Sequence, residues 1–333
     1  MKINKFLILA IFAALLAVPS CKKEKEDEVK YKNSFKGAVN FALPEFVAPG
    51  DVYNLVPSGL TRPEEGKGIG YYWDCPEMKI TKDTTRTEND PADQNGALKF
   101  TVRDTIGTMS MKCVAFAEGY YTASKSMNFV VIHPTKSLMI EDLVMDAKTY
   151  ADPRDGRVYK YKKIGNVDWM LENLAYAKSG VSYHECKAMD PVYGRLYRWE
   201  EAKTACPEGW RLPSKAEWNE LFGTVSKNAE NPTEGIAGAL MVPAKINHEK
   251  MWEFWPEVKI TNQSDFSAIP VGYVQYSGKS PKFVGSFQYA TFWSTEEYDA
   301  EKAVYYYLYM KNPNVLVGSA HKSSFATSVR CVR

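Results

Sequence analysis

The sequence lacks the short motifs that usually mark a catalytic site. It contains neither the Gly-x-Ser-x-Gly pattern of serine hydrolases nor a phosphate-binding P-loop. It has only four histidines, and His248-Glu249 lacks the second histidine of a zinc-protease helix because Trp252 occupies that position. No Cys-x-x-Cys pair occurs, so no zinc pattern of cysteines is present. We therefore predict no catalytic residues, no metal site and no cofactor, and expect a protein that is not an enzyme.

Acidic residues do occur in adjacent pairs, at Glu200-Glu201 and Glu296-Glu297. Two carboxylates are what a glycosidase needs, but acidic pairs are also common on ordinary solvated faces. We interpret both pairs as solvated.

An excess of charge of either sign is missing as well. The chain has 42 Lys and Arg residues against 40 Asp and Glu residues. Lys2 and Lys5 lie in an N-terminal leader, so the chain after that leader has no formal net charge. A neutral chain has no overall field that attracts polyanions, and we expect no nucleic-acid partner.

One long apolar run is present, at residues 6–18. It is shorter than the roughly 20 residues that cross a bilayer, and it fits the apolar region of a signal peptide. The run ends in Val18-Pro19-Ser20-Cys21, which resembles the lipobox of bacterial lipoproteins. The resemblance implies that residues 1–20 are removed and that Cys21, acylated with palmitate or a similar chain, anchors the protein in membrane lipid. An ordinary signal peptide followed by an incidental cysteine is the alternative.

Residues 21–34 continue with a charged stretch that has no hydrophobic period. Such a stretch is typical of a solvated tether. Charges directly after the lipidated cysteine also resemble the surface-export signals of Bacteroidetes-type lipoproteins. We therefore expect an outer-membrane lipoprotein exposed at the cell surface, with a plain spacer as the alternative reading of the tether.

Residues 35–133 have the pattern of an all-β domain. Short apolar or alternating segments are separated by Gly, Pro, Asp and Asn, at residues 38–43, 98–102, 109–117 and 128–132. Met109, Met111 and Cys113 share one face of a strand, since side chains alternate with period two. The spacing resembles Ig-like and PKD-like sandwich modules of bacterial surface proteins. Cys75 and Cys113 are expected either to pair across two sheets or to remain as buried thiols.

A second domain is expected at residues 150–333, after a linker at residues 134–149. It opens with a predicted β-hairpin, because Gly165-Asn166 separates two strand-like segments at residues 157–163 and 167–170. The region 224–265 is rich in loop-forming residues. Strands are expected to resume at residues 269–275, 290–293, 304–310 and 324–332.

Two helices are predicted between the hairpin and the loop-rich region. Trp199, Ala202 and Cys206 lie on one face of the first helix, at the spacing of an amphipathic helix. Ser214 and Glu217 have the spacing of a capping box, which predicts the start of the second helix. These parts make the second domain an α+β unit.

An ordered series of motifs runs through this second domain. The motifs include Ile164-Gly165-Asn166, Trp169-Met170-Leu171-Glu172-Asn173, Tyr193-Gly194-Arg195-Leu196-Tyr197, Cys206-Pro207-Glu208-Gly209-Trp210, Phe292-Trp293-Ser294-Thr295 and Ser328-Val329-Arg330-Cys331-Val332. The series resembles the Fibrobacter succinogenes major paralogous domain, a module of exported proteins with a C-type-lectin-like fold. The sequence departs from that family at Asp265, where glycine usually precedes Phe266, so this loop is expected to differ.

The resemblance also implies a cysteine pairing. In this fold a Cys206–Cys331 disulfide would join the first helix to the last strand and leave Cys186 unpaired. A Cys186–Cys206 bond is the competing arrangement. The overall prediction is a mixed fold, with an Ig/PKD-like β-sandwich followed by a C-type-lectin-like domain.

The loop-rich region contains an aromatic cluster, Met251-Trp252-Glu253-Phe254-Trp255-Pro256. Lectin-like folds place binding loops here, so Trp252, Phe254 and Trp255 are candidates to stack on sugar rings or to anchor a protein ligand. The alternative is that both tryptophans belong to the core. We expect a non-enzymatic cell-envelope lipoprotein whose lectin-like domain binds a ligand or serves for display; the sequence does not identify the ligand. The competing hypotheses are an exported carbohydrate-active enzyme in a diverged lectin-like fold and a structural subunit of a surface appendage.

Overall fold

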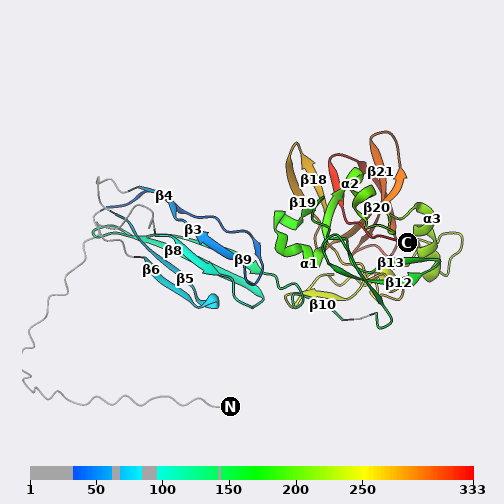
Figure 1. Ribbon diagram of the computed structural model, residues 1–333, viewed down its shortest axis with the longest axis horizontal. Coiled ribbons are helices and arrows are strands. Elements are labelled where there is room, and N and C mark those ends of the chain that lie inside the picture. The colour runs from blue at the N-terminus through cyan, green and yellow to red at the C-terminus, as the bar shows by residue number, and fades with distance from the viewer. Residues whose placement is uncertain (1–32, 62–67, 85–95, 142–143) are drawn as a thin grey trace, which may run out of the picture.

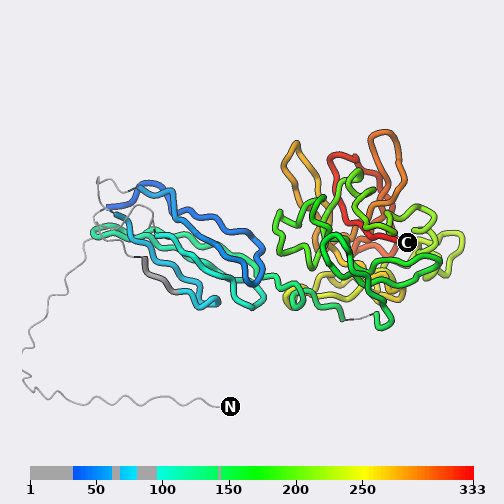
Figure 2. Tube along the Cα trace, viewed as in Figure 1, coloured from blue at the N-terminus to red at the C-terminus, as the bar shows by residue number. Residues whose placement is uncertain are grey.

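The computed structural model describes residues 33–61, 68–84, 96–141 and 144–333. The predicted signal peptide, Cys21 and most of the predicted tether lie outside the described residues. The chain forms a mostly β-protein with two bodies joined by a short connection near strand β10 (Leu138–Ile140) (Figures 1 and 2). No helix in the described ranges is long and apolar enough to cross a membrane.

In its described residues, the first body consists of strands and the short 3-10 helix η1 (Pro76–Met78). Its main sheet has the order β2-β9-β8-β5-β6, with bounds β2 (Phe46–Val47), β5 (Gly70–Cys75), β6 (Ile80–Thr84), β8 (Gly107–Phe116) and β9 (Ala123–Val131). Two antiparallel pairs accompany this sheet, β1 (Lys36–Asn40) with β4 (Ser58–Thr61) and β3 (Val52–Leu55) with β7 (Leu98–Thr101).

The alternating pattern predicted for strand β8 is confirmed. Met109, Met111 and Cys113 are buried, whereas Lys112 between them is exposed. Trp73 of β5 lies opposite Cys113 and is fully buried, and its indole nitrogen donates a hydrogen bond of 2.7 Å to the carbonyl of Gly96. One face of this sheet therefore supplies the core of the first body.

Cys75 and Cys113 are both buried and unbonded, which excludes a disulfide between them and confirms the alternative of two buried thiols. They do not face each other across two sheets, because β5 and β8 are neighbours in one sheet. Trp73 is the residue opposite Cys113, which leaves Cys75 as a diagonal neighbour. Diagonal positions lie about 7–8 Å apart, beyond the roughly 4.4–6.8 Å between the Cα atoms of a disulfide. Burial raises the pKa of Cys75 to about 11 and that of Cys113 to about 12.

Over its described residues the second body contains four sheets, three with three strands and one with five. Their orders are β10-β16-β17, β11-β12-β13, β14-β15-β23-β18-β19 and β20-β21-β22. The bounds are β11 (Lys148–Ala151), β12 (Val158–Ile164), β13 (Val167–Met170), β14 (Val181–Ser182), β15 (Arg195–Arg198), β16 (Ala244–Ile246), β17 (Glu249–Lys250), β18 (Tyr273–Ser277), β19 (Ser280–Val284), β20 (Tyr289–Glu297), β21 (Lys302–Tyr309), β22 (Leu316–His321) and β23 (Phe325–Thr327). Strands β12 and β13 form the predicted hairpin around Gly165-Asn166.

Two helices of this body match the sequence expectation, α2 (Trp199–Ala205) and α3 (Lys215–Val225). The short helices are η3 (Tyr183–Glu185), η4 (Lys187–Met189), α1 (Asp190–Tyr193) and α4 (Ala237–Leu240). The predicted capping box of α3 is present: the Ser214 hydroxyl accepts from the Glu217 amide, and the Glu217 carboxylate accepts from the Ser214 amide at 2.8 Å. It satisfies backbone donors that a helix N-terminus otherwise leaves open.

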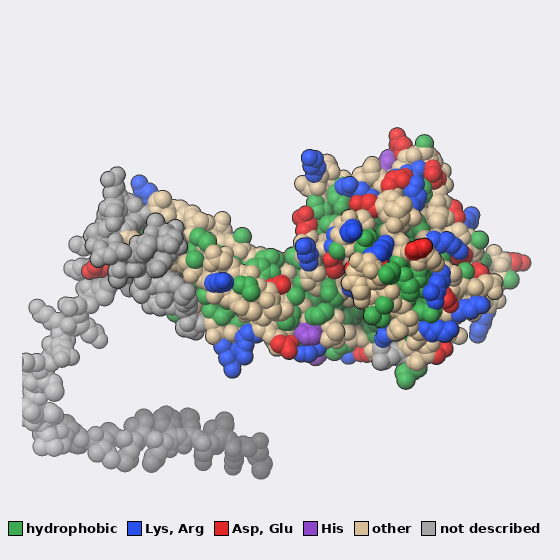
Figure 3. Space-filling view, viewed as in Figure 1, with side chains coloured by type: hydrophobic (Ala, Val, Ile, Leu, Met, Phe, Trp, Pro, Cys, Tyr) green, Lys and Arg blue, Asp and Glu red, His purple; other side chains and the backbone are tan. Residues whose placement is uncertain are grey.

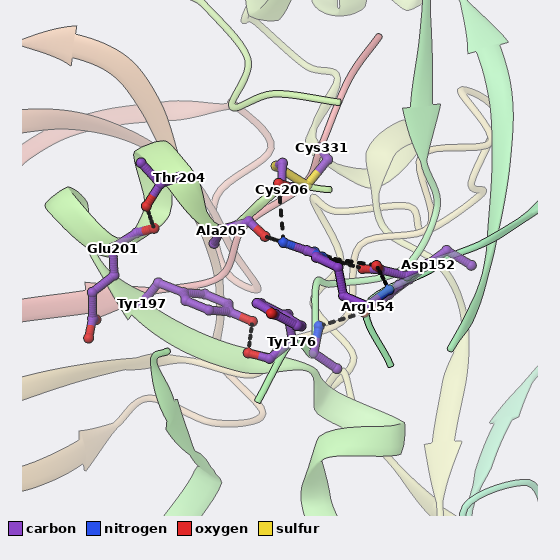
Figure 4. The surroundings of a disulfide bond; sticks show 11 residues. Asp152, Arg154, Tyr176, Tyr197, Glu201, Thr204, Ala205, Cys206 and Cys331 are labelled. Carbon is purple, nitrogen blue, oxygen red and sulfur yellow. Dashed lines mark hydrogen bonds and ion pairs between the residues drawn. A yellow bond between two sulfur atoms is a disulfide. The ribbon is translucent and has the colours of Figure 1, made fainter. Parts of the chain in front are cut away.

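The Cys206–Cys331 disulfide is present, with 5.9 Å between the two Cα atoms, and Cys186 is a free buried thiol. The competing Cys186–Cys206 bond is therefore excluded. Figure 4 shows Arg154 beside this bond, between the Asp152 carboxylate and the end of helix α2. Its guanidinium donates to the carbonyls of Ala205 at 2.8 Å and Cys206 at 3.3 Å. A cation at this position satisfies open carbonyls and complements the helix dipole.

Arg330, next to the disulfide in sequence, is buried without a carboxylate partner among the described residues. Its guanidinium donates to the Asn173 side chain at 2.7 Å and to the carbonyls of Phe266 at 2.6 Å and Ser267 at 2.9 Å. Burial lowers the pKa of Arg330 to about 9. The cation therefore fastens the last residues of the chain to the loop at residues 266–267.

The predicted difference of the Asp265 loop from the rest of the family stays a prediction, but the conformation of Asp265 itself is described. Asp265 has a φ of 62°, in the left-handed region that glycine adopts freely and Asp tolerates better than most residues. Its carboxylate lies 2.7 Å from the Lys162 ammonium of strand β12. The Asp265 side chain thus forms an ion pair that a glycine at this position could not form.

Candidate functional site

A cavity of about 310 Å³ opens beside the hairpin formed by β16 and β17. Its volume is at the lower end of the range for small-ligand sites, about 300–1,000 Å³. Its walls combine aromatic, aliphatic and charged side chains, contributed by Glu141, Pro243, Ala244, Lys245, Lys250, Trp252, Glu253, Phe254, Val258, Lys259 and Ile260.

The walls are positioned by a small sheet that local sequence alone did not reveal. Strand β10 pairs with β16, which places Glu141 beside the hairpin although it lies in the segment predicted as a linker. The turn residues Asn247 and His248 have φ values of 47° and 72°, as a two-residue type I′ hairpin turn requires. The resulting register sets Lys250 directly opposite Lys245. The two ammonium groups therefore arise from the same face of the hairpin.

Both tryptophans following this hairpin pack in or against the core, as the alternative interpretation predicted, and Trp252 lines the cavity as well. Trp252 is only 5% exposed, and its buried indole nitrogen finds no acceptor among the described residues. Phe254 also lines the cavity but is 86% exposed. Trp255 is not among the lining residues; its ring packs against the core and lies 5.0 Å from the Lys311 ammonium. Of the three candidates, the structure thus brings Trp252 and Phe254 together and places Trp255 elsewhere.

The rim of the cavity carries more donors than acceptors. The Glu141 carboxylate lies 2.5 Å from the Lys245 ammonium, and this hydrogen bond and charge hold the pKa of Glu141 below its ordinary value. Lys250 and Lys259 form no ion pair within the described part of the chain. The cavity therefore offers two uncommitted ammonium groups, against the single uncommitted carboxylate of Glu253.

Local sequence patterns did not indicate Glu141, Lys245, Lys250 or Lys259 as site residues. Glu141 reaches the cavity only through the pairing of β10 with β16, which joins segments about a hundred residues apart. A local signal did exist for the hairpin, because Asn247-His248 separates two short segments with a turn-forming asparagine. That signal could have predicted the hairpin, but not its neighbour.

The acidic pairs weighed as glycosidase carboxylates have structural partners instead. Each carboxylate is engaged by a lysine or a backbone amide: Glu200 by Lys203, Glu201 by the Arg198 amide, Glu296 by the Lys215 amide and Glu297 by Lys322. Over the described ranges, no group of three or more His, Cys, Asp and Glu side chains is arranged to hold a metal ion.

Comparison with known proteins identifies the second body. The family model of the Fibrobacter succinogenes major domain matches residues 163–333, slightly more than half of the chain. The matched region contains both longer helices, the disulfide and every cavity residue except Glu141. No curated protein and no solved structure matches the chain.

Proposed function

Because the chain belongs to the Fibrobacter succinogenes major domain family, we propose that it is a non-enzymatic cell-envelope lipoprotein that binds an acidic glycan through the cavity at Trp252 and Phe254. In this proposal the second body is a C-type-lectin-like domain and the first body is an Ig-like or PKD-like sandwich. An acylated Cys21 holds both at the outer membrane, with the second body displayed at the cell surface.

The exposure of Phe254 is the observation that carries the proposal. At 86% exposure its ring gains almost nothing from the fold, although burying a Phe side chain contributes about 1.5–3 kcal/mol. The ring lies at the mouth of a cavity that is also lined by Trp252. A flat apolar face of a sugar ring would cover Phe254, while its hydroxyls reach the polar rim.

The charges at the rim favour a sugar that carries a carboxylate. Lys250 and Lys259 have no ion pairs in the described ranges, and charge-assisted hydrogen bonds are stronger than neutral ones. An acidic sugar supplies both the ring face for Phe254 and the anionic oxygens for the two ammonium groups.

The carboxylates at the cavity favour binding over hydrolysis. Glycoside hydrolysis uses two carboxyl groups on opposite sides of the scissile bond. Glu141 and Glu253 are the carboxylates in the lining, and Glu141 is occupied by Lys245. A site with one uncommitted carboxylate is better suited to holding a glycan than to cleaving it.

The test is a glycan screen with the full chain, using uronic-acid-containing oligosaccharides and neutral counterparts of the same length. We expect binding of the acidic set, and Phe254→Ala should weaken it about tenfold. Tyr298→Ala is the matched control, because Tyr298 is 66% exposed and does not line the cavity. Unchanged affinity in Phe254→Ala, or cleavage of the bound glycan, would contradict the proposal. Equal binding of neutral and acidic sets would remove the assignment to acidic sugars.

A further inference from the structure

A second cavity, of about 210 Å³, lies between the two bodies. Figure 3 shows hydrophobic side chains gathering where the bodies meet, whereas charges of both signs are interspersed over the second body. The first body contributes Phe46, Gly107, Thr108, Val130 and Ile132, and the second contributes Tyr183, Met189, Tyr193, Ile246, Asn247, Glu249 and Phe287. Ligand sites occur preferentially at such domain interfaces.

The walls of this interdomain cavity are held together by direct contacts. The His184 ring nitrogen Nδ1 lies 2.6 Å from a carboxylate oxygen of Glu45. The Asn247 amide nitrogen donates to the Val131 carbonyl at 3.0 Å. The rings of Phe46 and Tyr183 lie 5.7 Å apart between centroids. Charged, polar and aromatic contacts between the bodies thus define a built cavity.

The lining has two kinds of chemistry, aromatic rings and hydrogen-bond acceptors. The aromatic residues are Phe46, Tyr183, Tyr193 and Phe287. Because the nitrogen of the Asn247 amide is used by Val131, its oxygen Oδ1 is left over, and this atom is buried with no donor within the described ranges. Glu249 adds a carboxylate that forms no ion pair among the described residues.

We propose that the interdomain cavity binds a small organic ammonium ion. Aromatic rings attract a cation through their negative faces, and aromatic cages are a known means of binding alkylated ammonium groups. The Glu249 carboxylate adds a negative charge, which attracts an ammonium ion whether or not that ion carries N–H donors. No Lys or Arg side chain lines the cavity, and the nearby His184 is engaged by Glu45. A volume of about 210 Å³ admits an ammonium head with a short stem, but no folded polypeptide segment.

The interdomain cavity is independent of the Trp252 cavity and has the opposite polarity. Three lysines line the cavity at Trp252, whereas the interdomain cavity has none. The two sites share no lining residue. Success or failure of either proposal therefore leaves the other unaffected.

The first test compares choline with its uncharged isostere, 3,3-dimethylbutan-1-ol, by calorimetric titration of the full chain. The two probes have the same shape and differ in charge, so choline should bind about tenfold more tightly. Equal affinities, or no binding of choline, would overturn the proposal. Binding of an Nα-blocked lysine peptide without binding of choline would overturn the assignment to a small molecule.

A conservative variant tests the acceptor. Glu249→Gln keeps the size of the side chain and removes its charge, and it should weaken choline binding about threefold to tenfold. Glu230→Gln is the matched control, since Glu230 is exposed and lies in neither cavity. Unchanged affinity in Glu249→Gln, or equal losses in both variants, would overturn the role given to Glu249 and with it the site.

The alkylation rates of the three free thiols test where the ammonium ion binds. Cys186 is 8% exposed and packs in the same cluster as Met189 and Tyr193, whereas Cys75 and Cys113 lie in the core of the first body. Saturating choline should slow alkylation of Cys186 about threefold or more and leave the rates of Cys75 and Cys113 unchanged. The reason is that Cys186 reacts when the site opens, and a bound ligand makes this opening rarer. Equal slowing of all three thiols, or of none, would overturn the placement.

Discussion

The two bodies provide hydrogen-bond partners for their backbone amides and carbonyls in different ways. In the first body, long neighbouring strands such as β8 and β9 pair continuously, and their amides and carbonyls satisfy one another. Its two cysteines remain thiols. In the second body, long stretches between α3 and β18 have little regular structure, and side chains supply hydrogen-bond partners for the backbone there. Where strands pair regularly, the backbone groups bond to one another. Where the chain is irregular, a few polar side chains must bond to the backbone groups instead.

The polar side chains of the second body show this dependence directly. Arg330 donates to three backbone carbonyls, those of Met170, Phe266 and Ser267. Asn262 accepts from the Ser267 amide at 2.8 Å and donates to the Ser267 hydroxyl at 3.0 Å. A buried backbone group without a partner costs about 1–3 kcal/mol, so these contacts replace what a sheet would supply. The second body should therefore be more vulnerable than the first to single changes.

The largest expected effect is loss of the disulfide. Cys331→Ser should destabilise the second body by about 2–5 kcal/mol, because the Cys206–Cys331 bond closes a long loop. The first body has no disulfide among the described residues, so its transition should not move. Calorimetry with and without reductant, on the full chain, separates the two transitions. Equal shifts of both transitions would contradict the contrast.

Arg330→Met should cost about 3 kcal/mol, since it leaves buried carbonyls without donors. Met approximates the length and apolar stem of Arg, so the change removes mainly the hydrogen bonds. Chemical denaturation measures the loss. Arg195→Met is the comparison variant, because Arg195 is another largely buried arginine, but its partner is the Asp190 carboxylate and its loss leaves this loop intact. Native stability in Arg330→Met would show that the carbonyls find other partners.

The capping box predicts a pH dependence of intermediate size. Burial opposes ionisation of Glu217, but hydrogen bonds from Arg211 and Ser214 outweigh it and hold the pKa of Glu217 below its ordinary value. A carboxylate with a lowered pKa stabilises the fold above its unfolded pKa, near 4.5, and this stability is lost as the pH falls through the folded pKa.

Glu217→Gln should therefore cost about 1 kcal/mol at pH 7 and have progressively less effect below pH 4. Denaturation curves at pH 7 and at pH 3 provide the measurement. A cost that is the same at both pH values would mean that the charge of Glu217 is not what stabilises the start of α3.

The smallest expected effect is at Asp265. Asp265→Gly removes an ion pair with Lys162 worth no more than about 1 kcal/mol, and glycine relieves the left-handed backbone conformation by a similar amount. The net change in the free energy of unfolding should stay within about 0.5 kcal/mol. Asp265→Val keeps the strain without the ion pair and should be clearly worse. If both variants behave alike, backbone conformation does not limit this loop.

Local sequence was sufficient wherever neighbouring residues decide the structure. The capping box of Ser214 and Glu217 and the hairpin at Gly165-Asn166 depend on spacings of a few residues, and both are present. The alternation of Met109, Met111 and Cys113 needed only the period of a strand. The family could be identified because its motifs follow one another along the chain.

Only the tertiary structure decided which distant residues meet. The state of Cys75 and Cys113 depended on β5 and β8 being adjacent in one sheet, and no local pattern specifies strand order. Glu141 joined the lysines of the Trp252 cavity through the pairing of β10 with β16. The burial of Arg330 depended on a loop more than sixty residues earlier in the chain. Local patterns fix torsions and faces, whereas the choice among distant partners follows from how whole elements pack and satisfy their buried polar groups.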